Sequence, residues 1–242
     1  MSRKRSGLRC AFALATALVV ALTLHPGAAR ADGEAWFWVE NRVPIVRPDV
    51  PGDLRLDWRV MTDLRVAKRS GGIGQAFLRT GPLLYPTSFM FIGLHGVVYS
   101  DRLPSGLHDQ EARVELEPNF FGRIGDFTFN DRNRVEYRWR ESGERWRYRN
   151  QLRVNYAPVG AKWIPFMWDE VLCDLSGLGV NQNRLEVGLA RMLNPSTRLD
   201  VGYMIRSRED AAGNWAHDHI LNLYLFLDVV PRPPPPPAPA PP

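Results

Sequence analysis

Charged side chains recur at every second position over long stretches of this chain of 242 residues. Arg134, Glu136 and Arg138, for example, alternate with Val135 and Tyr137. Because successive side chains of a β-strand point to opposite faces, this spacing gathers guanidinium and carboxylate groups on one face of a sheet. Such a face predicts one of two roles: Arg–Glu ion pairs that fill a narrow barrel, or a basic stripe that draws anions into a pore.

The candidate residues for this charged face come from seven predicted strands, and we expect them to line the lumen of a barrel. Like charges directly opposite each other on neighbouring strands repel, so carboxylates or waters must lie between the arginines. The lumen-lining candidates are Arg55, Asp57, Arg59, Glu111, Arg113, Glu115, Arg134, Glu136, Arg138, Arg147, Arg149, Arg153, Glu170, Arg184, Glu186, Arg198 and Asp200.

Metal and cofactor chemistry has little support in the sequence. His217 and His219 share a face at positions i and i+2 of a strand, which suits a divalent cation, because imidazole is a common metal ligand. No further ligand lies at a fixed spacing from them, so ordinary polar residues at a membrane interface are the alternative. Asp169 and Glu170 point to opposite faces of one strand and form no carboxylate dyad, and Cys173 is interpreted as a packing residue. We predict no cofactor.

An acyl hydrolase is the alternative from the enzyme class. Some outer-membrane barrels carry a serine and a histidine on their outer surface, and such catalysis needs a hydroxyl activated by an imidazole that a third polar group orients. His95 and His108 lie near Ser88, Ser100 and Ser105 in the sequence, but no local signature links them. We therefore predict a protein without enzymatic activity and assign no catalytic residue.

The same period of two indicates an all-β fold, and two architectures fit it. A soluble sandwich or barrel turns its apolar face inward, whereas an outer-membrane barrel turns its apolar face to lipid. Strands of ten or more residues and an alternation of tight turns (85–88, 157–160, 194–196) with longer connections (68–75, 100–110, 174–182, 207–218) favour the membrane barrel. Aromatic residues near strand ends, where interface girdles lie, point the same way: Trp36, Trp38, Tyr85, Tyr99, Tyr137, Trp139, Tyr156 and Trp163.

The alternation gives eleven strand-like runs, whereas bacterial single-chain barrels usually have an even number of strands. We therefore expect an antiparallel up-and-down barrel of ten to twelve strands, with twelve preferred because the segment 118–130 is long enough to hide a turn. The runs are 35–43, 54–67, 75–85, 88–100, 109–118, 126–141, 145–157, 163–173, 183–193, 197–206 and 217–229.

Both ends of the chain are predicted to lie outside the barrel, which we place at 32–230. Residues 1–31 have a basic start, an apolar stretch from Ala11 to Leu24 and a small-residue pattern before Asp32, as in a cleaved signal peptide. Its removal takes five of the 31 basic side chains and no acidic one, leaving 26 of each sign and no net charge. The high isoelectric point therefore does not indicate nucleic-acid binding. The proline-rich segment 231–242 is predicted to be a disordered tail.

The mature chain resembles the DUF2490 family, whose members are predicted to be small outer-membrane barrels. The likeness rests on Arg-Thr-Gly-Pro at 79–82, Arg-Tyr-Arg-Asn at 147–150, Glu170, and Asn183-Arg184 followed by Gly188. It implies a location and a fold but no activity.

These observations predict an exported barrel in the outer membrane of a Gram-negative bacterium. Its expected partners are outer-membrane lipid, the barrel-assembly machinery during insertion and small anionic solutes, with no nucleic acid. A narrow pore or a passive structural barrel is the expected function. The alternatives are a lipid-modifying acyl hydrolase and an adhesin or scaffold that acts through its loops.

Overall fold

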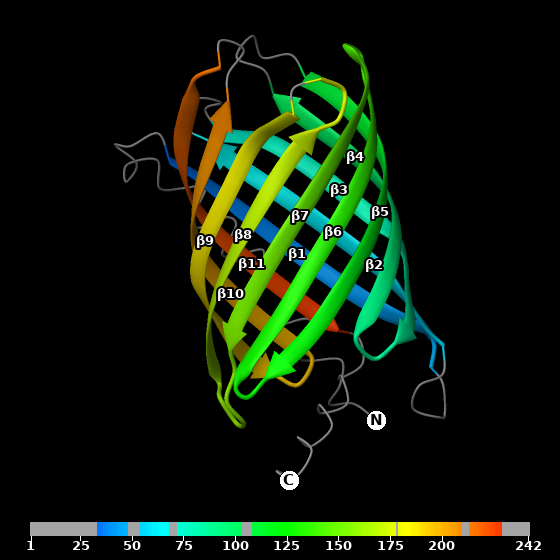
Figure 1. The fold of residues 1–242 in the computed structure, drawn as a ribbon, viewed down its shortest axis with the longest axis vertical. Helices are drawn as coiled ribbons and strands as arrows, with labels where there is room; N and C mark the ends of the chain where they lie inside the picture. Colours follow the sequence, from blue (N-terminus) through cyan, green and yellow to red (C-terminus); the bar gives the residue numbers. More distant parts are fainter. Residues whose placement is uncertain are drawn as a thin grey trace.

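The computed structural model describes residues 33–47, 54–67, 72–102, 108–177, 179–209 and 213–228. These residues form eleven β-strands that close into one barrel (Figure 1). The expected signal peptide (1–31) and proline-rich tail (231–242) lie outside the described residues. The strands are β1 (Gly33–Val46), β2 (Arg55–Ala67), β3 (Gly72–Thr87), β4 (Met90–Arg102), β5 (His108–Ile124), β6 (Phe127–Arg140), β7 (Gly143–Tyr156), β8 (Trp163–Asp174), β9 (Gly179–Asn194), β10 (Thr197–Glu209) and β11 (Trp215–Asp228).

Each strand pairs antiparallel with its neighbour in the sequence, and β1 closes the barrel against β11 in parallel. This parallel seam runs from the pair Gly33–His219 to the pair Arg42–Asp228. A closed meander with an odd number of strands requires one parallel pair, because its first and last strands run in the same direction. The all-β antiparallel barrel of ten to twelve strands is thus confirmed, but the preference for an even number was wrong.

The segment 118–130 does not hide an additional strand. Strand β5 continues to Ile124 and β6 begins at Phe127, so only residues 125–126 form the turn. Gly125 has a φ of 57°, a left-handed conformation that a glycine adopts without steric cost. The two strands stay paired up to this turn, from Glu111–Arg140 to Ile124–Phe127.

The connections define two rims, named for their positions in Figure 1. The upper rim is formed where β2, β4, β6, β8 and β10 end and the strands that follow them begin. The lower rim is formed where β1, β3, β5, β7 and β9 end and the strands that follow them begin. The tight turns expected near residues 85–88 and 194–196 have two residues each, but the expected tight turn at 157–160 belongs to a six-residue connection. Strand β1 begins at the upper rim, and β11 ends at the lower rim.

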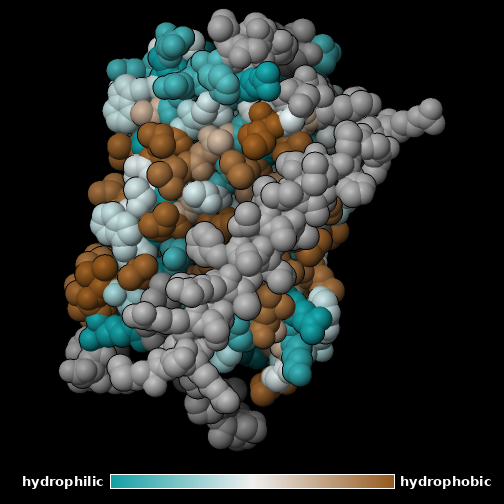
Figure 2. Space-filling view, turned by 180° about the vertical axis from the view of Figure 1, so that it is seen from behind, coloured by the Kyte–Doolittle hydropathy of each residue, from teal (hydrophilic) through white to brown (hydrophobic). Residues whose placement is uncertain are grey.

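The outer wall of the barrel is rich in exposed apolar side chains, contributed by most strands. Figure 2 shows such side chains over the middle of the wall seen from behind, with hydrophilic ones gathered at the upper rim. Exposed members include Val60, Leu78, Leu94, Val98, Val114, Leu116, Leu152, Met167, Leu185, Val187, Leu189, Val201 and Leu221. The described residues of the chain also contain no helix that is long and apolar enough to cross a membrane.

Polar groups on this outer wall bond to one another. On β6 and β7, the side chain of Asn150 donates to Asp131 over 2.7 Å and to Asn133 over 3.1 Å, and Tyr148 donates to Asn133 over 2.6 Å. These bonds satisfy donors and acceptors that an apolar environment would otherwise leave unpaired.

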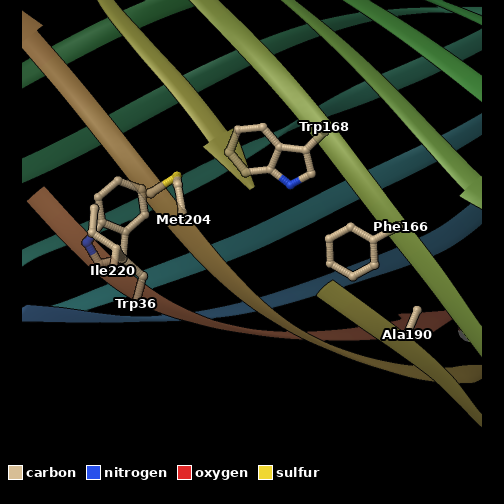
Figure 3. Packing of buried hydrophobic residues seen from close by; sticks show 6 residues of the cluster. All are labelled: Trp36, Phe166, Trp168, Ala190, Met204 and Ile220. Carbon is tan, nitrogen blue, oxygen red and sulfur yellow. The ribbon is translucent and has the colours of Figure 1, made fainter. Parts of the chain in front are cut away.

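One side of the interior is filled by apolar side chains. Six buried residues from β1 and β8–β11 form this inner apolar cluster, which Figure 3 shows: Trp36, Phe166, Trp168, Ala190, Met204 and Ile220. Four of the eight aromatic residues expected at the membrane interface instead lie inside. Trp36 is in the cluster, Trp38 packs against it, and Tyr85 and Tyr99 contact Arg55 and Arg113. The inward faces of β1, β3 and β4 mix aromatic with polar residues, so polarity alone assigned these rings to the wrong side.

Candidate functional site: a charged barrel interior

The seventeen lumen-lining candidates all lie on the inward faces of their strands. Four of them, Arg55, Arg147, Arg153 and Arg198, are half-buried, and each forms an ion pair with a buried carboxylate. The other thirteen are buried: Asp57, Arg59, Glu111, Arg113, Glu115, Arg134, Glu136, Arg138, Arg149, Glu170, Arg184, Glu186 and Asp200. A polar interior inside an apolar outer wall is the reverse of the arrangement in a soluble barrel.

Single carboxylates in the interior each hold several arginines. Glu111 on β5 bonds to Arg138 on β6 over 2.5 and 2.8 Å, and it also contacts Arg113 on its own strand and Arg140 on β6. Three guanidinium groups thus share one carboxylate. Arg113 also lies 4.0 Å from Glu136, so two carboxylates face these three guanidinium groups.

The network continues around the wall through Arg149 on β7. Its guanidinium donates to Glu136 on β6 over 3.0 Å and to Glu170 on β8 over 2.7 and 2.8 Å. Glu136 also accepts from Arg147 over 2.7 Å, and Glu170 accepts from Arg184 on β9 over 3.1 Å. Removing one partner of a buried ion pair of this kind would leave an uncompensated buried charge.

Other ion pairs join strands that are not neighbours. Arg153 on β7 reaches Asp200 on β10 over 2.7 Å, and Arg132 on β6 reaches Glu170 on β8 over 2.8 Å. Across the seam, Arg206 on β10 reaches Glu34 on β1 over 2.8 Å. These ion pairs cross the interior and connect strands that are not joined by backbone hydrogen bonds.

An open cavity of about 190 Å³ lies toward the upper rim, and we call it the upper vestibule. Ten of its fifteen lining residues are arginines, and none of those lining residues is acidic. The aromatic and amide residues that complete its lining are Trp38, Gln75, Phe77, Tyr99 and Gln182. The ten arginines are Arg65, Arg79, Arg113, Arg138, Arg140, Arg147, Arg149, Arg184, Arg206 and Arg208.

Seven carboxylates behind this lining pair with the ten arginines: Glu34, Asp63, Glu111, Glu115, Glu136, Glu170 and Asp218. Three of the seven also pair with arginines outside the vestibule, since Glu115 and Glu136 contact Arg134, and Glu170 contacts Arg132. Among the described residues, the arginines of the vestibule thus outnumber the carboxylates with which they pair, and an anion from solution would offset this excess of positive charge.

Two further cavities continue from the upper vestibule toward the lower rim. A central cavity of about 90 Å³ shares Arg79, Arg149 and Arg184 with the vestibule. A lower cavity of about 630 Å³ shares Arg59 and Arg153 with the central one. Arginines thus line all three cavities, and the central one has the smallest volume.

Several interior residues were missing from the candidates. Glu40, Arg79 and His95 are all buried, and each lies on a strand whose inward face also carries apolar residues. Arg79 bonds to Glu115 over 2.7 Å, and the Nε2 atom of His95 lies 3.5 Å from Arg59. Side chains alternate between the inward and the outward face of each strand. Following this alternation from Asp57 or Glu115 across to the paired residues of the neighbouring strands would have found these three residues. The polarity of the side chains within a single strand could not.

The serine and histidine candidates for hydrolysis are partly brought together. His95 is buried in the interior, whereas Ser100 and His108 form a hydrogen bond of 3.1 Å at the upper rim between Oγ and Nδ1. Ser88 lines the lower cavity. Ser105 lies outside the described residues.

The metal candidates point away from the interior. The Nδ1 atom of His217 lies 2.9 Å from the hydroxyl of Ser207, and that of His219 lies 2.5 Å from the hydroxyl of Tyr203. Among the described residues, no group of three or more histidine, cysteine or acidic side chains could hold a metal ion. The structure thus places these two imidazoles in separate hydrogen bonds with neighbouring hydroxyl groups.

The fold and site together define a closed β-barrel with an ion-paired, arginine-rich interior and an apolar outer wall. The chain belongs to a family described as protein of unknown function, DUF2490, which matches residues 33–217. No curated protein and no solved structure matched the chain. Residues that carried the resemblance meet in the interior, where Arg149 and Arg184 both bond to Glu170.

Proposed function

We propose that this protein is a barrel of the Gram-negative outer membrane whose interior binds small anions and lets them pass. The observation that carries the proposal is the upper vestibule, which ten arginines line without an acidic residue among them. In selective channels, rings of like charge attract the ion of opposite sign. The succession of arginines through the central and lower cavities extends the same attraction along the barrel.

Placement in a membrane is supported by the outer wall. Its exposed apolar side chains match a lipid environment, and aromatic rings lie outward near both ends of the β6–β7 hairpin. Tyr137, Trp139 and Trp146 are in contact near the upper rim, and Phe127 and Tyr156 are in contact near the lower one. Two such girdles are typical of barrels in the outer membrane. Lipid is therefore one proposed partner, and a small anion is the other.

The structural alternative is a passive barrel in which the same arginines only brace the wall. Planar-bilayer recordings of the refolded mature chain, residues 32–242, separate the two. A passage for anions predicts discrete openings, with a conductance that falls when Arg138, Arg147 and Arg149 are all changed to Gln. The matched control is Arg191→Gln, since Arg191 stacks on Trp163 at the outer wall and does not line any of the three cavities. A folded barrel that stays silent would support bracing alone.

An acyl hydrolase at the membrane surface is the second candidate, because Ser100 and His108 form a hydrogen bond on the exposed rim. Phospholipid hydrolysis by the refolded chain, abolished in Ser100→Ala and in His108→Ala without loss of folding, would establish it. Equal hydrolysis by the wild type and Ser100→Ala would eliminate this pair as a catalytic site.

A further inference from the structure

The lower cavity differs from the upper vestibule in size and in chemistry. Its volume of about 630 Å³ is more than three times that of the vestibule and lies in the range of small-molecule sites. Phenylalanine rings make up a large part of its wall, together with six arginines and a single acidic residue. The rings are Phe89, Phe91, Phe121, Phe129 and Phe226; the arginines are Arg42, Arg59, Arg123, Arg132, Arg153 and Arg198.

The rings form an apolar wall beside the mouth. Phe91 is buried and contacts Phe121, with ring centroids 5.6 Å apart, and both belong to adjacent strands. Phe89 is exposed in the turn between β3 and β4. Exposed aromatic surface inside a cavity favours a ligand with a hydrocarbon or aromatic part, because its burial removes apolar surface from water.

The charges of this cavity leave one guanidinium without a carboxylate. Arg123 donates to the backbone oxygens of Gly125 over 2.8 Å and Ala157 over 3.1 Å, and it forms no ion pair with any described residue. The other five arginines share four carboxylates: Glu40, Glu117, Glu170 and Asp200. Arg123 lies at the exposed mouth, so a ligand can reach its positive charge.

We propose that the lower cavity binds an amphiphilic organic anion, that is, a carboxylate carried on an aromatic or short hydrocarbon body. Arg123 binds the carboxylate, and the exposed rings of Phe89 and Phe121, with the buried Phe91 packed behind Phe121, receive the body. This inference deepens the proposed function, since it names a class of anion for the same interior, but binding is measurable without conduction.

The test is calorimetric titration of the detergent-purified mature chain with 4-phenylbutyrate, its neutral analogue 4-phenyl-1-butanol, and inorganic phosphate. Phenylbutyrate is expected to bind at least about tenfold more tightly than either of the others, because only it satisfies both the charge and the rings. Equal affinity for phosphate or for the alcohol would overturn the proposal.

Two variants with matched controls place the ligand. Arg123→Gln and Phe89→Ser are each expected to weaken phenylbutyrate binding about tenfold. Arg191→Gln and Phe127→Ser, which alter the outer wall near the lower rim, are expected to leave it unchanged. Loss of affinity in the controls as well, or in neither set, would contradict the assignment.

The chain's own tail is the competing occupant, because residues 229–242 follow β11 at the lower rim. A chain that ends at Val230 is expected to bind phenylbutyrate as the full mature chain does. A marked rise in affinity on truncation would show that the tail fills the cavity and would overturn the proposal of a free ligand. Binding without conductance would leave this inference intact and eliminate the pore; anion conductance without binding would do the reverse.

Discussion

Arg59 on β2 and Glu117 on β5 are joined by an ion pair of 2.8 Å that spans two intervening strands of the barrel wall. Both side chains are buried, and Glu117 also pairs with Arg134 on β6. The carboxylate thus fixes two guanidinium groups from opposite directions. Removing its charge would leave both of them buried without their main partner.

Glu117→Gln is therefore expected to lower the free energy of unfolding by about 3–5 kcal/mol, because a broken buried ion pair leaves uncompensated charge. Urea unfolding followed by tryptophan fluorescence in lipid vesicles measures the change. Glu144→Gln is the control, since Glu144 is exposed at the start of β7 and a Gln there can still accept the hydrogen bond from Tyr137. This variant should stay within about 0.5 kcal/mol of the wild type. Equal stability of the two variants would show that the interior pairs do not brace the barrel.

Gly81 on β3 lies where β3 and β4 approach each other closely. A Cβ atom at this position would lie 2.0 Å from the backbone oxygen of Leu94 on β4, so the two strands could not keep their spacing. Gly81→Ala is expected to reduce strongly the fraction that refolds, measured by the shift in electrophoretic mobility between heated and unheated samples. Gly96→Ala on β4, where a Cβ meets no atom within 4 Å, should fold normally. Normal folding of both would mean that β3 and β4 are further apart than described.

If the barrel spans a membrane as proposed, its odd strand number predicts termini on opposite sides of that membrane. Strand β1 begins at the upper rim and β11 ends at the lower rim, because β1 and β11 run parallel. An epitope tag inserted before Gly33 and one placed after the last residue should therefore differ in their accessibility to antibody on intact cells. If both tags behaved alike, the barrel would have an even number of strands.

Neutralising a carboxylate should have the opposite effect to neutralising arginines. Glu111 holds three arginines of the upper vestibule, so Glu111→Gln adds to the excess of positive charge there. The ratio of anion to cation permeability is expected to rise about twofold or more, the order for one unit charge at close range. Glu144→Gln should leave the ratio unchanged, and a fall in Glu111→Gln would contradict the role given to the vestibule.

The fold and the charged face were predictable from the sequence because both depend on local alternation. Arg134, Glu136 and Arg138 stand on one side of β6 whatever the partners of that strand are. The parallel seam was not predictable in this way, because the pairing of Trp36 with Asn222 joins segments at opposite ends of the chain.

The composition of the interior was also only partly predictable from the alternation within single strands. Arg79 and Trp36 were placed wrongly or overlooked because the inward faces of β3 and β1 mix charged with apolar residues. The excess of arginine over carboxylate in the vestibule could not be predicted from the sequence either. It depends on side chains from many strands, which meet only once the barrel has closed.

The central claim, that the interior passes anions, is tested most directly by the reversal potential of the refolded mature chain in a planar bilayer under a gradient of KCl. The account predicts a reversal potential of the sign set by chloride, reduced toward zero when Arg138, Arg147 and Arg149 are changed to Gln. A potential of the sign set by potassium, or a folded barrel that carries no current, would contradict it.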